Sequence, residues 1–229
     1  MAGGFYGIGR INQRIFHTGD ERLIRKLSEI SQVISYKRGE EIYAIGEAYT
    51  YFFILIQGLT YTYFCDEQKR FITNCFFSRK YDFLNIEAYD KQASVGMKAL
   101  MDTEVYAVPI QAALAAVKEL PGLAWEYANY LQKSMVYLCV VNNRRMYFSS
   151  NQRYQWFCEK WPQALSLASN RQIATFLRIR PESLSRLKSQ LKQCDSGNEA
   201  LANILVTKDL QWDYMDIKQI MEKKENTEY

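Results

Sequence analysis

The chain has 229 residues and a mass of 26.9 kDa, which fits one large domain or two small ones. Hydrophobic residues make up 48% and charged residues 24%, a globular composition that excludes a disordered or fibrous protein. No apolar run approaches the roughly 20 residues that a membrane-spanning helix needs, and the first ten residues lack the features of an export signal. We therefore expect no membrane partner and a cytoplasmic location.

Cysteine and histidine usage argues against most metal and nucleophilic chemistry. The five cysteines are widely spaced without a C-x-x-C pair, and the single histidine is His17. A disulfide framework or a tetrahedral zinc site is therefore not expected. A catalytic Ser-His-Asp or Cys-His arrangement would have only one imidazole to draw on. We predict no cofactor, no metal site and no enzymatic activity.

The positive charge of the chain is concentrated in one segment. The formal charge is only +4, but residues 150–194 alone hold eight Lys or Arg and two acidic residues. A basic segment attached to a near-neutral body is typical of a nucleic-acid-binding module joined to another domain. A solvated basic face without a nucleic-acid partner would give the same count.

Residues 33–108 have the pattern of short strands separated by turns. Aromatic and β-branched residues are enriched and partly alternate, while Gly39, Gly46 and Gly58 stand where the chain must reverse. Several short strands at regular intervals predict a small β-barrel or roll.

A long helix is predicted from Pro121 to about Phe148, where no proline or glycine follows Gly122. Its three- and four-residue spacing predicts a seam that packs along the same helix of a second copy. The residues assigned to this dimer contact are Tyr127, Leu131, Ser134, Leu138 and Val141. The other faces carry large side chains that we expect to cover the barrel, namely Trp125, Tyr130, Met135 and Tyr137. A single helix buried within its own chain is the alternative.

The remaining residues, 150–229, are predicted to form a second, helical domain. Ser169 is suited to cap a helix over 170–177, and Pro181 is suited to the first turn of a helix over 181–193. Two helices joined by about four residues, the second with Ser and Arg on its early turns, predict a helix-turn-helix. A short strand after Gly197 and a terminal helix from Trp212 complete the prediction.

The order and spacing of these motifs resemble those of the Crp/Fnr superfamily of transcription regulators, from about Ile30 to Ile220. The matching segments are 36–40 (YKRGE), Gly46-Glu47, Phe53-x-Leu-x-x-Gly58, 99–105 (ALMDTEV), 173–174 (IA) and 181–186 (PESLSR). The resemblance implies an α+β fold with an N-terminal jelly-roll-like β-roll, a long central dimerisation helix and a C-terminal winged helix-turn-helix. The implied domains are residues 1–121 (arm and cyclic-nucleotide-binding-like roll), 122–149 (dimerisation helix) and 150–229 (DNA-binding domain).

The second helix of the predicted helix-turn-helix carries candidate base-reading residues. Glu182, Ser185 and Arg186 lie at i, i+3 and i+4 and so share one face. Arginine can donate two hydrogen bonds to guanine, and glutamate can accept one from cytosine. Resemblance to the Glu-Ser/Thr-x-Ser-Arg subgroup implies that these residues read a half-site containing TGA. Candidate phosphate contacts are Arg171, Arg178, Arg180, Ser183 and Lys188. A surface ion pair between Glu182 and Arg186 is the alternative.

One departure from the family pattern lies in the helix-turn-helix turn. Arg178 stands where family members usually have glycine. This predicts a bulky residue in or near the left-handed conformation, at a cost of about 1 to 2 kcal/mol. A contact between Arg178 and a phosphate would offset that cost.

A second departure lies at the effector site. Members that bind cyclic AMP carry Gly-Glu and Arg-Ser where this chain has Asn85-Ile86 and Ala93-Ser94. Without that glutamate and arginine, cyclic nucleotide binding of the usual kind is not expected. Any effector pocket would involve Asn85, Ile86, Ala93, Ser94 and Tyr127.

The sequence therefore predicts a homodimeric, sequence-specific DNA-binding transcription regulator that acts on a palindromic site, with an unidentified effector or none. Expected partners are double-stranded DNA and a second copy, with RNA polymerase and a small-molecule effector as further candidates. One alternative is a small-molecule-binding signalling module whose basic domain contacts protein. Another is a thiol redox switch that uses Cys158 or Cys194, with a pKa lowered by basic neighbours.

Overall fold

A computed structural model of the chain describes residues 11–12, 15, 21–85 and 92–194. Several sequence predictions lie outside these residues. They concern the N-terminal arm, His17, Ile86, the strand after Gly197 and the helix from Trp212.

The predicted roll is present as two antiparallel sheets. One has the strand order β1-β7-β3 and the other β2-β6-β4-β5. The strands are β1 (Gln32–Tyr36), β2 (Glu41–Tyr43), β3 (Tyr51–Gln57), β4 (Thr60–Cys65), β5 (Phe71–Phe77), β6 (Gly96–Ala99) and β7 (Thr103–Pro109). Their inward-facing side chains, among them Phe53, Leu55, Met97 and Val105, form the core between the sheets.

Turn chemistry explains where the strands reverse. All three glycines that the sequence places at reversals have positive φ angles, and Gly58 between β3 and β4 has a φ of 116°. A Cβ atom at Gly58 would also collide with Thr103 on β7, so this reversal requires glycine for two reasons.

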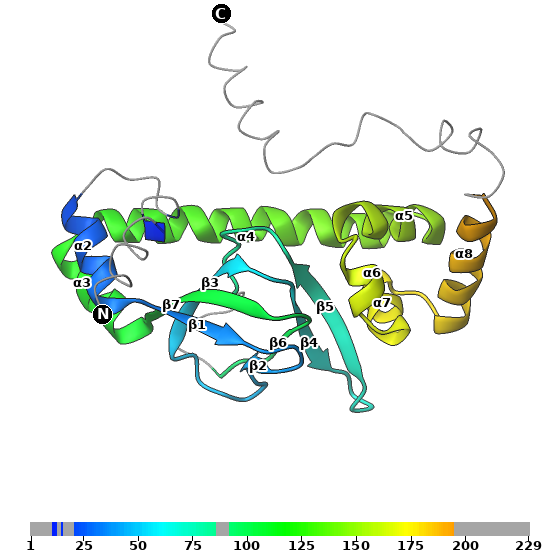
Figure 1. The fold of residues 1–229 in the computed structure, drawn as a ribbon, viewed down its shortest axis with the longest axis horizontal. Helices are drawn as coiled ribbons and strands as arrows, with labels where there is room; N and C mark the ends of the chain where they lie inside the picture. The colour runs from blue at the N-terminus through cyan, green and yellow to red at the C-terminus, as the bar shows by residue number, and fades with distance from the viewer. Residues whose placement is uncertain (1–10, 13–14, 16–20, 86–91, 195–229) are drawn as a thin grey trace, which may run out of the picture.

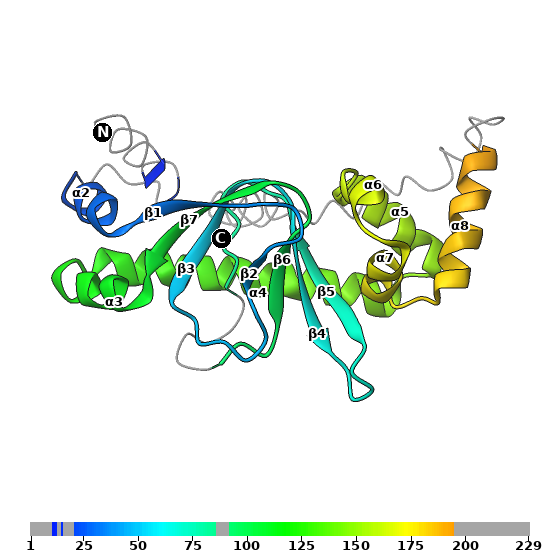
Figure 2. The ribbon, with the colours of Figure 1, turned by 60° about the horizontal axis from the view of Figure 1, so that its bottom comes forward.

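Helices lie along one side of the roll and at both of its ends. They are α2 (Glu21–Ile30), α3 (Ile110–Glu119), α4 (Gly122–Tyr147), α5 (Ser150–Lys160), α6 (Ala164–Leu167), α7 (Asn170–Leu177) and α8 (Pro181–Cys194). Helix α4 runs the length of the molecule, with α2 and α3 at one end and α5 to α8 at the other (Figure 1). The roll lies against the middle of α4, as Figure 2 shows from a second direction. None of the helices in the described ranges is long and apolar enough to cross a membrane.

Helix α4 covers the roll, but with only two of the four large side chains that the sequence suggested. The hydroxyl of Tyr137 donates to the carbonyl of Phe76 at 2.5 Å, and Tyr130 is buried as expected. The same prediction is wrong for Trp125 and Met135, which are 71% and 62% exposed. These two side chains lie on the opposite face of the helix, away from the core.

The C-terminal helices and the roll share one hydrophobic core. Phe76 on β5 is fully buried, and its ring contacts Phe157 and Trp161 at centroid distances of 5.4 and 5.8 Å. Phe176 on α7 lies 5.1 Å from the same ring. The helix-turn-helix is therefore packed directly against β5 of the roll, and is not tethered by α4 alone.

Candidate nucleic-acid interface

The helix-turn-helix is formed by α7, a tight turn and α8. Ser169 caps α7 as predicted, because its hydroxyl accepts from the Gln172 N–H while the Gln172 side chain accepts from the Ser169 N–H. Helix α7 ends at Leu177, and α8 begins at Pro181, where a missing N–H costs nothing. This local sequence therefore fixes both the start of the first helix and that of the second.

Arg178 occupies the turn in the left-handed conformation, with φ 54° and ψ 45°. The N–H of Arg178 donates to the carbonyl of Thr175 at 3.1 Å, and Ile179 donates to Ala174 at 3.0 Å. These bonds close the end of α7 in the way a C-terminal glycine usually allows. The expected strained arginine is thus present, and its side chain is exposed.

Helix α8 has one buried and one exposed face. Leu184 and Leu187 pack into the shared core, whereas Glu182, Ser185 and Arg186 are exposed on the other side. Within the part of the chain that the structure describes, no ion pair joins Glu182 to Arg186. Both charged groups are therefore available to an outside partner.

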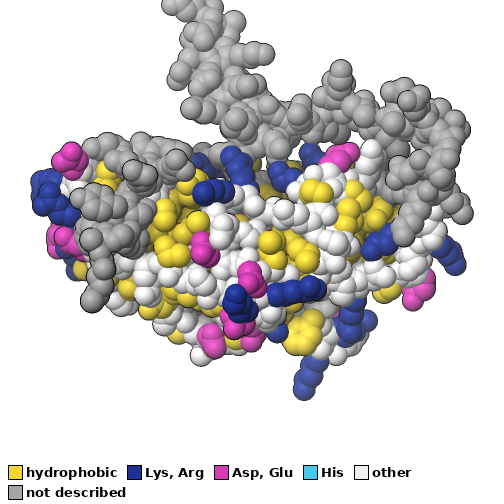
Figure 3. Space-filling model, viewed as in Figure 1, with side chains coloured by type: hydrophobic (Ala, Val, Ile, Leu, Met, Phe, Trp, Pro, Cys, Tyr) yellow, Lys and Arg dark blue, Asp and Glu magenta, His cyan; other side chains and the backbone are white. Residues whose placement is uncertain are grey.

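The candidate phosphate contacts surround this exposed face. Arg171 and Arg180 are exposed, while Ser183 and Lys188 are half-buried. The ammonium group of Lys188 donates to the Asn170 side chain at 2.6 Å, which ties α8 to the first turn of α7. Basic side chains are visible at the α8 end of the molecule in Figure 3. No acidic residue of the described chain pairs with these cations.

An antiparallel two-sheet roll, a long helix along it and a C-terminal helix-turn-helix together define the fold class. Solved structures that share it include the following three. FixK2 of Bradyrhizobium japonicum has a TM-score of 0.61 and 20% identity over 72% of this chain and 85% of its own. A protein of Eubacterium rectale described as a transcriptional regulator of the Crp/Fnr family has a TM-score of 0.63 and 16% identity over 76% and 83%. CLP of Xanthomonas campestris, a c-di-GMP-responsive global regulator, has a TM-score of 0.59 and 14% identity over 76% and 91%.

These similarities confirm the α+β architecture and the structural part of the resemblance read from the sequence. The chain has the fold of Crp/Fnr regulators. No protein-family model and no curated protein matches the sequence.

Two of the candidate effector residues are occupied with structural contacts. The Asn85 side chain accepts the Phe53 N–H at 2.7 Å and donates to the Tyr51 carbonyl at 3.0 Å. Ala93 is buried, and its N–H donates to the Glu47 carbonyl at 2.8 Å. Asn85 therefore holds strand β3 in place, and both the oxygen and the nitrogen of its amide already have partners within the chain.

The other candidate effector residues have different surroundings. Tyr127 packs against Phe52 and Phe83, with ring centroids 5.2 and 6.0 Å away, in a cluster distinct from that of Ala93. Ser94 is exposed and Ile86 lies outside the described residues. The effector pocket read from the sequence therefore stays a prediction.

The residues assigned to the dimer contact differ in their exposure. Val141 and Leu138 pack into cores of their own chain, Tyr127 contacts the roll, and Ser134 is half-buried. Only Leu131 is exposed. Val141 is buried in its own chain and has no surface to offer to a second copy. The assignment of the other four residues to a dimer contact stays a prediction.

Sequence reasoning missed a different apolar stripe on α4. Its exposed residues repeat at seven-residue intervals: Trp125, Gln132, Cys139 and Met146 in one row, and Ala128, Met135 and Asn142 in the other. This spacing is visible in the sequence, but the inward face of α4 is also apolar at similar spacing. Periodicity alone could not tell the two faces apart.

The thiol alternative loses its physical basis at Cys158. Burial raises the pKa of the Cys158 thiol, the opposite of what an activated thiolate requires. The side chain of Cys194, the second candidate, is outside what the structure describes. In the described ranges no group of three or more His, Cys, Asp or Glu is placed to hold a metal ion.

Proposed function

We propose that this protein is a homodimeric, sequence-specific DNA-binding transcription regulator that reads a two-fold symmetric site. The single observation that carries the proposal is the division of α8 into two faces. Leu184 and Leu187 anchor one face in the core. On the other face Glu182, Ser185 and Arg186 are exposed, and none of them forms an ion pair with another described residue. A helix mounted in this way presents a rigid row of donors and acceptors to a major groove.

Base reading is assigned to the exposed triplet on α8. Arg186 would donate to guanine O6 and N7, and Glu182 would accept from cytosine N4. The Ser185 hydroxyl donates to the Pro181 carbonyl at 3.1 Å, which leaves its oxygen lone pairs to accept from a base. The residues that would hold phosphates and set the register are Arg171, Arg178, Arg180, Ser183 and Lys188.

Dimerisation is assigned to the exposed stripe of α4. Trp125, Met135 and Met146 are more than three-fifths exposed, and the stripe to which they belong extends over most of the helix. Seven-residue spacing is the pattern of two helices packed side by side. We assign the stripe to a second copy of this chain because a two-fold axis along α4 would also pair the two α8 helices for a symmetric DNA site.

The proposed division into a roll (1–121), a dimerisation helix (122–149) and a DNA-binding domain (150–229) follows from these roles. A regulator of this kind acts where the genomic DNA lies, which for a bacterial protein is the cytoplasm. RNA polymerase is the partner that an activator would contact. The roll would take an unidentified small effector, or hold the regulator in a form that needs none.

Selection of bound duplexes from a random DNA pool tests the proposal directly. The purified full-length chain is used at near-physiological salt without added ligand, and the Glu182→Ala/Arg186→Ala double variant is the control. We expect enrichment of a two-fold symmetric sequence, with TGA in each half, by the native chain and not by the variant. A pool that stays random with the native chain, both with and without a small-molecule effector library, would overturn the proposal.

A further inference from the structure

Arg145 connects three elements at the junction between the roll and the C-terminal helices. It lies on the last turn of α4 and is only 6% exposed. One terminal nitrogen donates to the carbonyl of Asn74 on β5 at 2.9 Å, and the other donates to the Asn142 side chain at 2.8 Å. The guanidinium also lies over the ring of Phe176 on α7, 5.3 Å from its centroid. The Arg145 side chain therefore contacts β5, α4 and α7 at the same time.

The charge of Arg145 is not matched by an acidic group. The ion pairs among the described residues all join other side chains, and the Arg145 Nε atom is buried without a hydrogen-bond partner there. Burial and the nearby charge of Arg178 both lower the pKa of Arg145. A buried charge of this kind contributes less to stability than a well-packed apolar residue would. Arginine adds a rigid planar guanidinium, which fixes the direction of each hydrogen bond that it donates.

Two further bonds hold the same junction. The Thr73 N–H on β5 donates to the Thr175 hydroxyl on α7 at 3.2 Å. Arg153 on α5 donates to the backbone carbonyl of Arg145 at 3.0 Å, which fastens α5 to the end of α4. Helix α7 is thus oriented against β5 at two points, and α8 is carried by α7 through the shared core.

We propose that Arg145 is a positioning residue for DNA reading, which fixes α7 and α8 relative to α4 and β5 and thereby sets the half-site spacing that the dimer accepts. This inference rests on the proposed function. In a dimer joined along α4, the distance between the two α8 helices depends on how rigidly each helix-turn-helix is docked. A rigid docking accepts one spacing, near one helical turn of DNA, and a loose docking accepts several.

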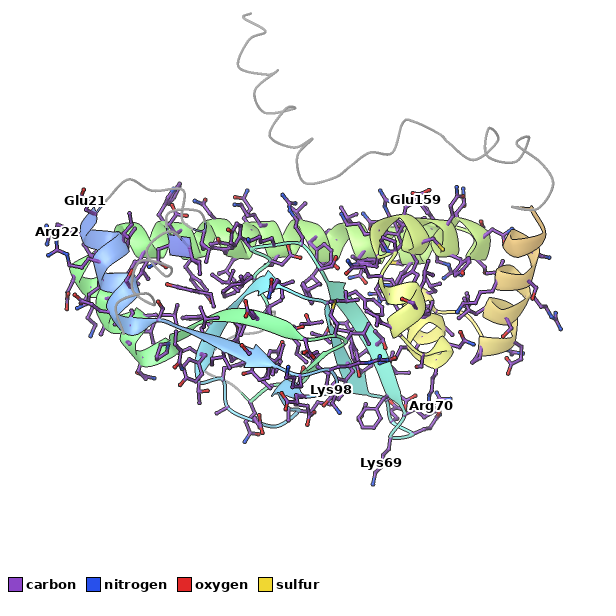
Figure 4. All side chains as sticks on the ribbon, in the orientation of Figure 1. Glu21, Arg22, Lys69, Arg70, Lys98 and Glu159 are labelled. Carbon is purple, nitrogen blue, oxygen red and sulfur yellow. The ribbon has the colours of Figure 1, made fainter. Side chains whose placement is uncertain are left out.

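The test is a competition among duplexes that carry the selected half-sites separated by spacers of every length up to one helical turn. Arg145→Lys keeps the charge and the apolar stem but loses the planar guanidinium. Thr175→Val removes the second tie and leaves Arg145 intact. Arg70→Gln is the matched control, because it removes an arginine from the β4–β5 hairpin (Figure 4), where the guanidinium pairs with Asp66. Circular dichroism and thermal unfolding establish that each variant is folded.

The native chain and Arg70→Gln should prefer one spacing, and in Arg145→Lys and Thr175→Val that preference should fall about tenfold, equivalent to 1.4 kcal/mol. The base sequence of each half-site should not change, because α8 keeps its own reading face. The inference is overturned if folded Arg145→Lys and Thr175→Val retain the native spacing preference, or if the native chain accepts all spacings equally. Failure of the native chain to bind any half-site would instead overturn the proposed function.

Discussion

Phe76 of the roll and Phe176 of the helix-turn-helix pack edge to face, with ring centroids 5.1 Å apart and planes at 79°. Both side chains are fully buried. Edge-to-face pairs add about 0.5 to 1.5 kcal/mol to the burial of their surface. The contact joins residues a hundred positions apart in sequence, so the stability of the helix-turn-helix depends on the roll.

We expect Phe76→Ala to lower the free energy of unfolding by about 3 to 5 kcal/mol, since it leaves a cavity in the shared core. Tryptophan fluorescence of Trp156 and Trp161 and hydrogen exchange in β7 should report one common transition. Phe71→Ala is the matched control on the same strand, and because Phe71 is largely exposed its effect should be much smaller. Two separate transitions in the native protein would contradict a shared core.

Local signals in the sequence were sufficient for the helix-turn-helix. Ser169 and Pro181 mark helix starts through the hydrogen bonds of one turn, and the structure begins α7 and α8 at those points. Gly58 likewise stands at a chain reversal, and its positive φ angle is a property of that turn. Features of this kind depend on few residues and can be predicted without the rest of the fold.

Features that depend on distant parts of the chain were not predictable in the same way. Whether Trp125 or Val141 faces the roll depends on how α4 is rotated, and both lie on apolar faces of the helix. Asn85 stands at a family ligand position, but its hydrogen bonds to β3 depend on packing that no motif encodes. The role of Arg145 was missed because its partners come from β5 and α7.

Removal of the Arg186 guanidinium, to which we assign base reading, should affect specificity more than overall affinity. We expect Arg186→Ala to lose about 1 to 3 kcal/mol of discrimination at one base pair of each half-site. Arg171→Ala should instead weaken binding to all sequences and reduce the salt dependence of the affinity by about 0.9 for each phosphate that is no longer neutralised. Binding constants for matched and mismatched duplexes at several salt concentrations separate the two. An equal loss on specific and random DNA in Arg186→Ala would contradict its assignment.

The native cysteines provide a test of the α4 stripe without engineered residues. Cys139 is exposed in the middle of the stripe, so a symmetric dimer should bring the two copies of its thiol close together. A short bismaleimide should therefore cross-link the native chain and Cys65→Ser, but not Cys139→Ser. Met135→Glu should shift the protein to monomer in analytical ultracentrifugation, because it buries a charge in the seam. Cross-linking that requires Cys65, or a monomeric native chain, would exclude the stripe as the dimer contact.

Asp82, which follows β5, should make stability depend on pH. Its carboxylate accepts from the Arg79 N–H at 3.2 Å, and burial raises the pKa of Asp82 to about 6. The folded protein therefore holds a proton that the unfolded chain releases near pH 4, so the free energy of unfolding falls as pH rises from about 4 to 6. The fall is at most about 3 kcal/mol.

Asp82→Asn should remove this fall, because a neutral amide can accept the same hydrogen bond. Chemical unfolding at pH values between 4 and 8 measures the effect. Asp66→Asn is the control, since hydrogen bonds from Arg70 lower the pKa of Asp66, and it should leave the fall between pH 4 and 6 in place. An unchanged pH profile in Asp82→Asn would show that another group is responsible.

Arg178 should have opposite effects on stability and on DNA binding. Its left-handed backbone, with φ 54°, suits glycine better than a residue with a side chain. We expect Arg178→Gly to raise the free energy of unfolding by about 1 kcal/mol. It should also weaken DNA binding for every sequence, with a salt dependence reduced by about 0.9, because one DNA phosphate is then left without its cation.

Arg178→Ala separates the two causes, because it removes the charge and keeps the backbone strain. This variant should bind DNA as weakly as Arg178→Gly without the gain in stability. Urea unfolding and salt titrations of DNA binding on the three proteins measure both quantities. If Arg178→Gly binds DNA as well as the native chain, the side chain does not bind a phosphate, and an arginine in place of glycine at this turn has a cost in stability that DNA binding does not offset.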